Sequence, residues 1–257
     1  MKKIRSSASQ VSKFRRCRRA FAFEYVEGLR PPPSTKQEFG LEMHSELEQW
    51  LKQNKPPSDS PAGETARQGI EKGWLPIPSD HLLVEKKFVF EWVPGVEMIG
   101  YIDCVDPPRQ FDTDYPIVID HKSTSDLRWA MSFSQLASDP QAIIYSVWAM
   151  LEYEKPQVRA RWIYYAASNP RNGPRKPRGA KPVEVLFDSR DLDFQAKVSS
   201  ISSDLIEIAQ IRREEIKGLE LPPSPESCEV FGGCFHKSIC SLSTEDKIEG
   251  YMKKVCE

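Results

Sequence analysis

A β-sheet is predicted by two neighbouring stretches, EMIGYIDCV at residues 97–105 and YPIVIDHKS at residues 115–123. Both are rich in β-branched and other apolar residues, and the polar stretch PPRQFDTD separates them, as expected of consecutive antiparallel strands. The stretch LLVEKKFVFEWV, at residues 82–93, has the same character and ends at a Val-Pro-Gly turn. The sheet therefore begins near residue 82.

Helical patterns flank these strands. Residues 139–153, DPQAIIYSVWAMLEY, begin with Asp139 as N-cap and Pro140 at the first helical position. Before the sheet, we expect a basic amphipathic helix that Ser7 or Ser9 caps and that runs past residue 17, a second helix over residues 37–53 and a short one over 64–73. After residue 153, we expect strands at residues 159–167 and 183–187, a connecting loop at 168–182 and a long helix over 191–217.

Length and composition indicate a globular protein. The chain has 257 residues, of which 28% are charged and 39% hydrophobic, and we expect one main domain over residues 1–257. Its parts would be a helical region (1–75), a sheet core (80–190) and a C-terminal helix with a cysteine-rich tail (191–257). We expect no membrane span, because every apolar run is too short. The basic N-terminus lacks an apolar signal core, so we expect a cytoplasmic protein, in the host cytoplasm if the chain is viral.

Positive charge is unevenly distributed although the net charge is −1. Such clusters can neutralise phosphates of a nucleic acid, and they can equally be solvated surface. The N-terminal cluster comprises Lys2, Lys3, Arg5, Lys13, Arg15, Arg16, Arg18 and Arg19, and the loop cluster comprises Arg171, Arg175, Lys176, Arg178 and Lys181.

Carboxylates on the two central strands form a candidate metal site. Because side chains alternate along a strand, Asp120 and Lys122 share one face, and pairing with the preceding strand brings Asp103 near Asp120. Buried carboxylates need a partner or a metal, and oxygen ligands suit Mg²⁺ or Mn²⁺. An Asp-x-Lys triplet alone is as consistent with a surface ion pair.

Four motifs in a fixed order make the pattern specific. They are GLEMHSELE with His44, GYID with Asp103, IDHK with Asp120 and Lys122, and DPQAIIYS with Gln141 and Tyr145. Together they resemble the PD-(D/E)xK nuclease superfamily, and within it the RecB-like and Cas4-like exonuclease branch. The resemblance implies a restriction-endonuclease-like α/β core, with a central mixed β-sheet flanked by helices and a C-terminal cysteine-rich cluster-binding segment. It also implies hydrolysis of DNA phosphodiester bonds with Mg²⁺ or Mn²⁺.

Each of these residues has a role implied by the resemblance and an ordinary alternative. His44, Asp103, Asp120 and the backbone carbonyl of His121 would bind the metal. Lys122 would position the attacking water or offset charge in the transition state, and Gln141 and Tyr145 would contact the nucleotide or support the site. Taken singly, the histidine and the tyrosine could also be core residues, and the glutamine could belong to a capping turn.

Six cysteines without a secretion signal favour metal ligation over disulfides. Cys228, Cys234 and Cys240 lie close together and need a fourth ligand. Cys17 resembles the early cysteine of iron–sulfur members of this branch, which implies a [4Fe–4S] cluster held by these four. Five residues separate the first two late cysteines where the family commonly has two, so a zinc site remains an alternative, with His236 as a possible substitute ligand. We expect Cys104 to pack in its strand and Cys256 to lie at the chain end.

The resemblance implies a DNA partner, single-stranded or frayed. The chain has no phosphate-binding GxxxxGK[ST] motif, so unwinding would require a helicase or recombination partner. Such an enzyme would act in recombination, repair or phage- or CRISPR-related DNA processing. Two alternatives stay open: a non-catalytic DNA-binding or assembly subunit with the same fold, and a zinc-stabilised binding module.

Overall fold

The computed structural model describes residues 3–109, 114–168, 173–229 and 233–240. Contacts within the chain divide it into two compact units. The first unit comprises Met1–Pro33, Val89–Ile99 and Ser199–Glu257, and the second comprises Ser34–Phe88 and Gly100–Val198. The organisation as one nuclease domain over residues 1–257 stays a prediction. Cys256, Arg171, Lys2 and Asp112 lie outside the described residues.

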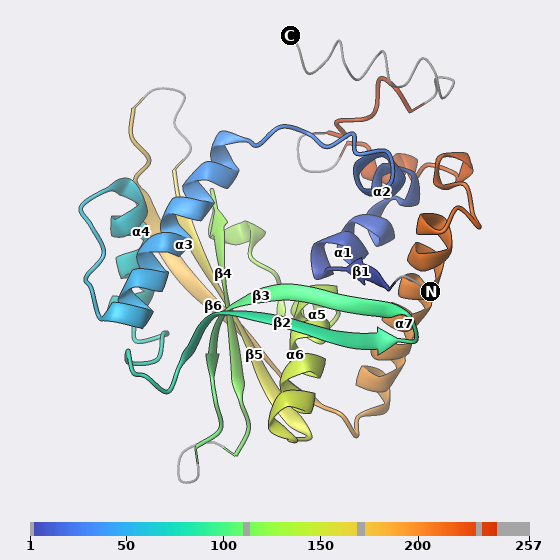
Figure 1. The fold of residues 1–257 in the computed structure, drawn as a ribbon. Helices are drawn as coiled ribbons and strands as arrows, with labels where there is room; N and C mark the ends of the chain where they lie inside the picture. Colours follow the sequence, from blue (N-terminus) through green and yellow to red (C-terminus); the bar gives the residue numbers. More distant parts are fainter. Residues whose placement is uncertain (1–2, 110–113, 169–172, 230–232, 241–257) are drawn as a thin grey trace. The chain divides into compact units, whose positions relative to one another are not determined.

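The sheet is mixed (Figure 1). Its strands hydrogen-bond in the order β1-β3-β4-β5-β6, and β2 also pairs with β3. The pairs β3/β4 and β5/β6 are antiparallel, whereas β1/β3 and β4/β5 are parallel. A parallel β4/β5 pair requires a crossover, and α6 supplies it. The strands are β1 (Ile4–Ser6), β2 (Leu83–Val93), β3 (Val96–Asp106), β4 (Ile117–Thr124), β5 (Gln157–Ala167) and β6 (Pro177–Asp188).

The described helices are α1 (Ala8–Arg16), α2 (Arg18–Tyr25), α3 (Thr35–Gln53), α4 (Pro61–Glu71), α5 (Phe133–Leu136), α6 (Pro140–Tyr153) and α7 (Leu192–Arg212). The described residues also form three short 3-10 helices, labelled η1 (Leu127–Trp129), η2 (Gly218–Glu220) and η3 (Pro225–Ser227). Among the helices so described, none is long and apolar enough to cross a bilayer.

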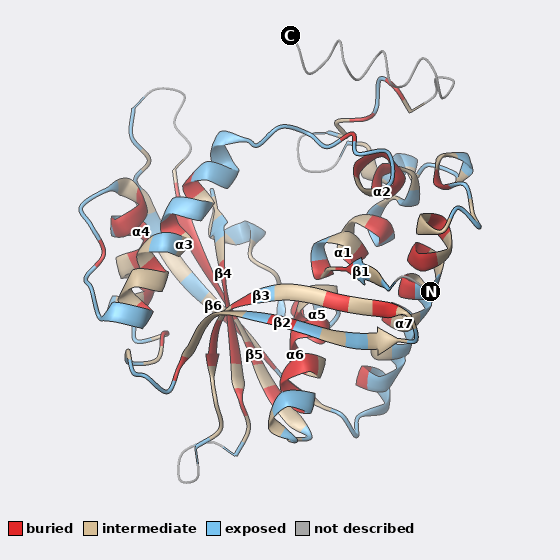
Figure 2. Ribbon diagram, in the orientation of Figure 1, coloured by how far each residue is buried: buried red, intermediate tan, exposed pale blue. Residues whose placement is uncertain are grey.

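Helices cover the sheet of the second unit on both faces. One core cluster packs α3 and α4 against alternate residues of β4 and β5, such as Ile119 and Ile163. On the other face, Tyr145 of α6 packs against Trp162 of β5, with ring centroids 6.3 Å apart. The central strands are accordingly buried along most of their length (Figure 2). This α/β arrangement is consistent with a restriction-endonuclease-like fold, as predicted.

The first unit has its own small core. Phe23 of α2 packs with Leu29 and Ile239, two buried residues that lie more than 200 positions apart in the sequence. Ion pairs join the unit's two ends, including Arg15 Nε to Asp204 Oδ2 at 2.5 Å. These contacts hold the N-terminal helices to the C-terminal segment.

The predicted N-terminal helix is wrong in one respect: it is two helices. Cys17 is extended, with φ −163° and ψ 111°, and serves as the C-cap of α1 and the N-cap of α2. The apolar period runs through the break, so the pattern hides it. The Cys17 Sγ accepts a hydrogen bond from the Ala20 N–H at 3.5 Å, which stabilises the extended conformation of Cys17.

Three further boundaries differ from prediction. The predicted loop over residues 168–182 is partly strand, since β6 begins at Pro177 and pairs with β5. The long helix ends at Arg212 instead of residue 217, and the left-handed Glu214, with φ 62°, follows its end. The short helix begins at Pro61, three residues early, because Ser60 caps it. Strand β1 and helix α5 were not predicted.

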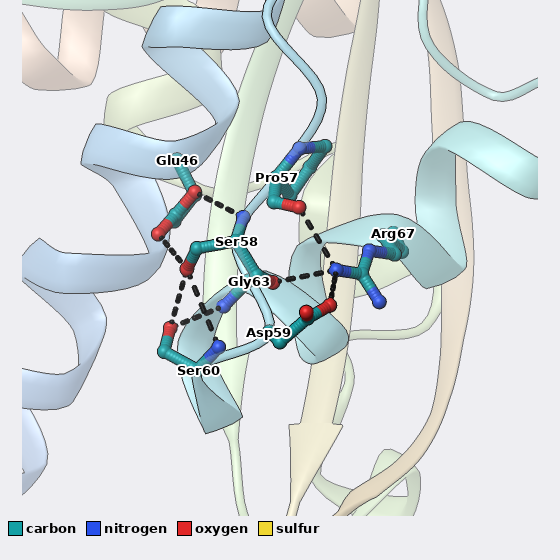
Figure 3. Close-up of polar contacts among 7 residues, drawn as sticks. All are labelled: Glu46, Pro57, Ser58, Asp59, Ser60, Gly63 and Arg67. Atoms are coloured by element: carbon teal, nitrogen blue, oxygen red, sulfur yellow. Dashed lines mark hydrogen bonds and ion pairs between the residues drawn. The ribbon is translucent and has the colours of Figure 1, made fainter.

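A dense set of hydrogen bonds ties α3 to the segment that leads into α4 (Figure 3). Glu46 accepts from the Ser58 N–H at 2.9 Å and from its hydroxyl at 2.5 Å, and Ser60 caps α4 by accepting from the Gly63 N–H at 3.1 Å. Arg67 Nη2 donates to the Ser58 carbonyl at 2.8 Å. A Cβ at Gly63 would lie 2.2 Å from that carbonyl oxygen, so glycine is required there.

Candidate active site

Asp120 lies on β4 and is only 2% exposed. Its Oδ2 pairs with Lys122 Nζ at 2.6 Å, and its Oδ1 accepts from Gln141 Nε2 at 2.8 Å. Lys122 is the next residue but one on the same strand, so it projects from the same face as predicted. The carboxylate is thus buried between an ion pair and a hydrogen bond, and the Lys122 side chain is half-buried, so the two do not form a surface ion pair.

Gln141 connects the carboxylate, the lysine and α6. Its Oε1 accepts from Lys122 Nζ at 2.8 Å, while its Nε2 also donates to the Tyr145 hydroxyl at 2.9 Å. The Tyr145 hydroxyl in turn donates to the Tyr101 carbonyl at 2.7 Å. Asp139 caps this helix, accepting from the Ala142 N–H at 3.3 Å, so the position of the glutamine follows from the predicted cap.

His44 approaches the strands from α3. Its Nδ1 lies 3.5 Å from Asp103 Oδ2, and the same oxygen accepts from the His121 N–H at 2.7 Å. Gly40 lies one helical turn earlier, where a Cβ would be 3.0 Å from Ser123 Oγ on β4. The glycine-x-x-x-histidine spacing therefore lets α3 pack closely on β4 and directs the histidine toward Asp103.

Glu85 completes a group that sequence reasoning missed. One ligand atom from each of His44, Glu85 and Asp103 lies within 4.8 Å of the other two, which is a spacing that could hold a metal ion. Glu85 lies on β2 in the left-handed region, with φ 53°, a costly conformation for a non-glycine residue. The signal available in the sequence was a carboxylate inside the apolar strand pattern at residues 82–93.

Burial shifts the titration of the site residues. Burial raises the pKa of Asp120 to about 7 although Lys122 opposes the shift, and it lowers the pKa of His121 to about 4, so this imidazole is neutral. For Asp103, burial raises the pKa, but the contact with His44 outweighs it and the net pKa is lowered. Burial likewise lowers the pKa of Lys122, and the attraction of Asp120 reverses that to a net rise.

His121 is a packing residue by its side chain. It is 2% exposed, and the Tyr165 hydroxyl lies 3.4 Å from its Nδ1. Its ring is 5.9 Å from that of His44 in an edge-on arrangement. The imidazole thus supports the wall behind His44, and only its backbone is left as a candidate ligand.

The four predicted cysteine ligands line one cavity of about 190 Å³ in the first unit. The Cys234 N–H donates to the Cys228 carbonyl at 2.8 Å, so the longer spacing between these two still brings them side by side. Arg19 Nη1 lies 3.8 Å from Cys240 Sγ and 3.0 Å from the carbonyl oxygen of the same residue. The set Cys17, Cys228, Cys234 and Cys240 is therefore gathered at one place.

The remaining cysteine and histidine predictions are resolved differently. Cys104 is fully buried in β3, as predicted, and burial raises the pKa of its thiol. His236 also lines the cysteine cavity, but its Nε2 lies 3.3 Å from Glu24 Oε1. Lys13 Nζ binds the same carboxylate oxygen at 2.6 Å. This histidine thus contacts a buried carboxylate that Lys13 also pairs with.

Most of the N-terminal basic cluster is engaged in ion pairs. Besides Lys13 and Arg15, Arg18 Nε pairs with Glu207 Oε1 at 3.0 Å. Lys3 and Arg5 both pair with Glu97 on β3, at 3.1 and 3.2 Å. These side chains join the elements of the first unit, so their positive charge is largely balanced within the protein.

A sequence model of the PD-(D/E)XK nuclease superfamily matches the chain over residues 5–83 and 64–241. Among solved structures, the chain is similar to one described as "Crystal structure of SSO0001", with 15% sequence identity and a TM-score of 0.39. That similarity covers 81% of this chain and 78% of the other. A search of curated proteins found no significant match.

Proposed function

Since the chain belongs to the PD-(D/E)XK nuclease superfamily, we propose that it is a metal-dependent DNA exonuclease of the RecB-like and Cas4-like branch. The observation that carries the proposal is the buried contact of Asp120 with both Lys122 and Gln141, at 2.6 and 2.8 Å. Burying this carboxylate is unfavourable, and the arrangement is explained if it serves chemistry.

The donor set fits a hard divalent cation. In the proposal, His44, Asp103, Asp120 and the backbone carbonyl of His121 hold Mg²⁺ or Mn²⁺, and Glu85 joins them. Carboxylate and carbonyl oxygens are the ligands that these ions prefer. The bound ion supplies polarisation of the phosphate and a lower pKa for a coordinated water.

The protein's own groups orient the reaction. Lys122 keeps its charge because Asp120 raises its pKa against the effect of burial, so its Nζ can stabilise negative charge that develops on the phosphate. Gln141 holds the lysine and the carboxylate at once, through its Oε1 and Nε2. Tyr145 fixes Gln141 from the side of α6. In this proposal both α6 residues are positioning residues.

We assign the cysteine cavity to a [4Fe–4S] cluster held by Cys17, Cys228, Cys234 and Cys240. Support comes from the convergence of these four thiols from both ends of the chain. Such a cluster would join the two ends of the first unit, and its binding energy would add to the folding energy. Zinc is the competing occupant of this cavity. Metal analysis distinguishes iron from zinc, and so does colour, because a [4Fe–4S] protein is brown whereas a zinc protein is colourless.

The substrate in this proposal is single-stranded DNA or a frayed DNA end. A helicase or recombination partner would open duplexes, in recombination, repair or phage- or CRISPR-related DNA processing, and the enzyme would act in the cytoplasm. A non-catalytic DNA-binding subunit is less well supported, because the described site carries the full set of His44, Asp103, Asp120 and Lys122.

The proposal is tested with anaerobically purified protein, Mn²⁺ or Mg²⁺, and two single-stranded DNA substrates that differ only in having free ends or being circular. We expect degradation of the linear strand and not of the circle. Equal cleavage of both would contradict exonuclease action. Cys234→Ser in the same preparation should lower bound iron and the brown absorption, and bound zinc in place of iron would overturn the cluster assignment.

A further inference from the structure

Two large aromatic side chains protrude from the segment between β4 and α6. Trp129, at the end of η1, is 71% exposed, and Phe133, at the start of α5, is 64% exposed. Rings of this size are usually buried, because burial removes their apolar surface from water. Two of them four residues apart, on a loop beside a catalytic candidate, point to a surface that a ligand covers.

The segment holds these rings in an ordered backbone. On one side, the Asp126 carboxylate caps η1 by accepting from the Arg128 N–H at 2.9 Å. On the other, Ser132 and Gln135 form a capping box, in which the Ser132 N–H donates to Gln135 Oε1 at 2.8 Å. The segment therefore loses little conformational entropy when a ligand binds to both rings.

The segment also lies next to the candidate active site. The β4/β5 register pairs Lys122 with Tyr164, and the Met131 backbone lies beside the Tyr164 hydroxyl. At its other end the segment leads into α6, whose first turn carries Gln141. The two rings thus lie on a short segment that is close to Lys122 in two ways. Met131 lies beside Tyr164, the strand partner of Lys122, and the C-terminal end of the segment leads to Gln141, which contacts both Asp120 and Lys122.

Cationic side chains border the rings. The Arg128 guanidinium pairs with Asp126 Oδ2 at 2.9 Å, and its side chain stays 84% exposed. Lys176, just before β6, and Arg178, within it, are also exposed, and Arg178 acts electrostatically on Asp126. A Cβ at Gly179 would lie 3.5 Å from Leu127, which places this end of β6 against η1. Aromatic rings beside positive charge match the alternation of bases and phosphates in a single strand.

We propose that Trp129 and Phe133 form a stacking platform for unpaired nucleobases, with Arg128 and Arg178 contacting the adjacent phosphates. The inference rests on the proposed nuclease function and adds the residues that recognise the strand. A single strand is the occupant because its base faces are free to stack, whereas a duplex buries them against neighbouring pairs. The platform guides the strand toward Lys122.

Binding is measured without divalent metal, so that no cleavage occurs, by fluorescence anisotropy of a labelled single strand. Loss of one stacked base predicts that Trp129→Ala weakens binding about fivefold or more, and that the double change with Phe133→Ala weakens it further. Trp129→Phe should retain most of the affinity. Leu151→Ala, at a residue that is also 62% exposed on α6, is the matched control and should bind as the wild type does.

A strand of abasic sites separates stacking from charge. The wild type should bind it as weakly as the Trp129→Ala/Phe133→Ala double variant binds normal DNA, and the double variant should not distinguish the two strands. Equal binding of normal DNA by wild type and Trp129→Ala, or equal discrimination against the abasic strand by wild type and the double variant, would overturn the platform. Cleavage with Mn²⁺ should show a raised KM and an unchanged kcat; absence of cleavage by the wild type contradicts the nuclease proposal alone, since the binding measurements stand without it.

Discussion

Replacing Gln141 by Glu changes the candidate site with almost no change of shape. In the native protein Gln141 Nε2 donates to Asp120 Oδ1 at 2.8 Å and its Oε1 accepts from Lys122 at 2.8 Å. A glutamate keeps the acceptor and loses the donor. Gln141→Glu therefore tests whether the amide holds Asp120 in its reactive position, independently of packing.

The magnitude follows from two opposing charge effects and from the loss of both hydrogen bonds that Gln141 Nε2 donates, to Asp120 and to Tyr145, of which the bond to the charged carboxylate is the stronger. A second carboxylate about 4 Å from Asp120 adds repulsion of about 4 kcal/mol at an effective dielectric constant of about 20. Lys122 attracts the new carboxylate to a similar extent, so these contributions largely cancel. The lost donation to a charged group then sets the cost at about 1.5–3 kcal/mol, which corresponds to a decrease in rate of about 10- to 150-fold.

The assay is single-turnover cleavage of an end-labelled single strand at saturating Mn²⁺, with thermal unfolding to verify that the variant folds. Gln37→Glu is the matched control, because Gln37 uses its Oε1 as an acceptor in the capping box of α3, which glutamate also satisfies. It should cleave at the native rate. An unchanged rate in Gln141→Glu would refute the positioning role of the amide.

Three further outcomes follow from other parts of the chain. Gly63→Ala should destabilise the protein by about 1–3 kcal/mol in thermal melts, since its Cβ would lie 2.2 Å from the Ser58 carbonyl oxygen; an unchanged melting temperature contradicts this. Burial raises the pKa of Glu24, but His236 and its lysine partner outweigh that and lower it. This stabilisation is present above the pKa of an unfolded glutamate and lost as pH falls through the lower folded value, so Glu24→Gln should show a shallower loss of stability in urea titrations from about pH 5 to 3. Parallel pH profiles would exclude that contribution. Glu85→Gln should weaken Mn²⁺ binding in calorimetry, and native affinity would remove Glu85 from the ligand set.

Local rules were sufficient for much of the sheet and for the placement of Asp120 and Lys122 on one face. Strand alternation placed Asp120 and Lys122 on one face, and the Asp139 cap fixed where α6 begins and hence where Gln141 points. Both depend on residues close in sequence, whose geometry is nearly independent of the rest of the chain.

Features set by distant contacts could not be predicted in this way. Glu85 joins His44 and Asp103 from a left-handed position within β2, which no periodic pattern signals. Pro177 begins β6 because pairing with β5 outweighs the local tendency of a proline- and glycine-rich stretch to form a loop. Cys17 interrupts a helix whose apolar period continues unbroken.

Metal-dependent hydrolysis at the Asp120–Lys122 site is tested most directly by comparing the wild type with Lys122→Ala in one DNA cleavage assay, with and without Mn²⁺. Lys52→Ala is the control, because this lysine forms a surface pair with Glu48 at 2.6 Å. We predict Mn²⁺-dependent cleavage by the wild type and the control, and its loss in Lys122→Ala. Equal cleavage by all three proteins, or cleavage that persists without metal, would contradict the assignment.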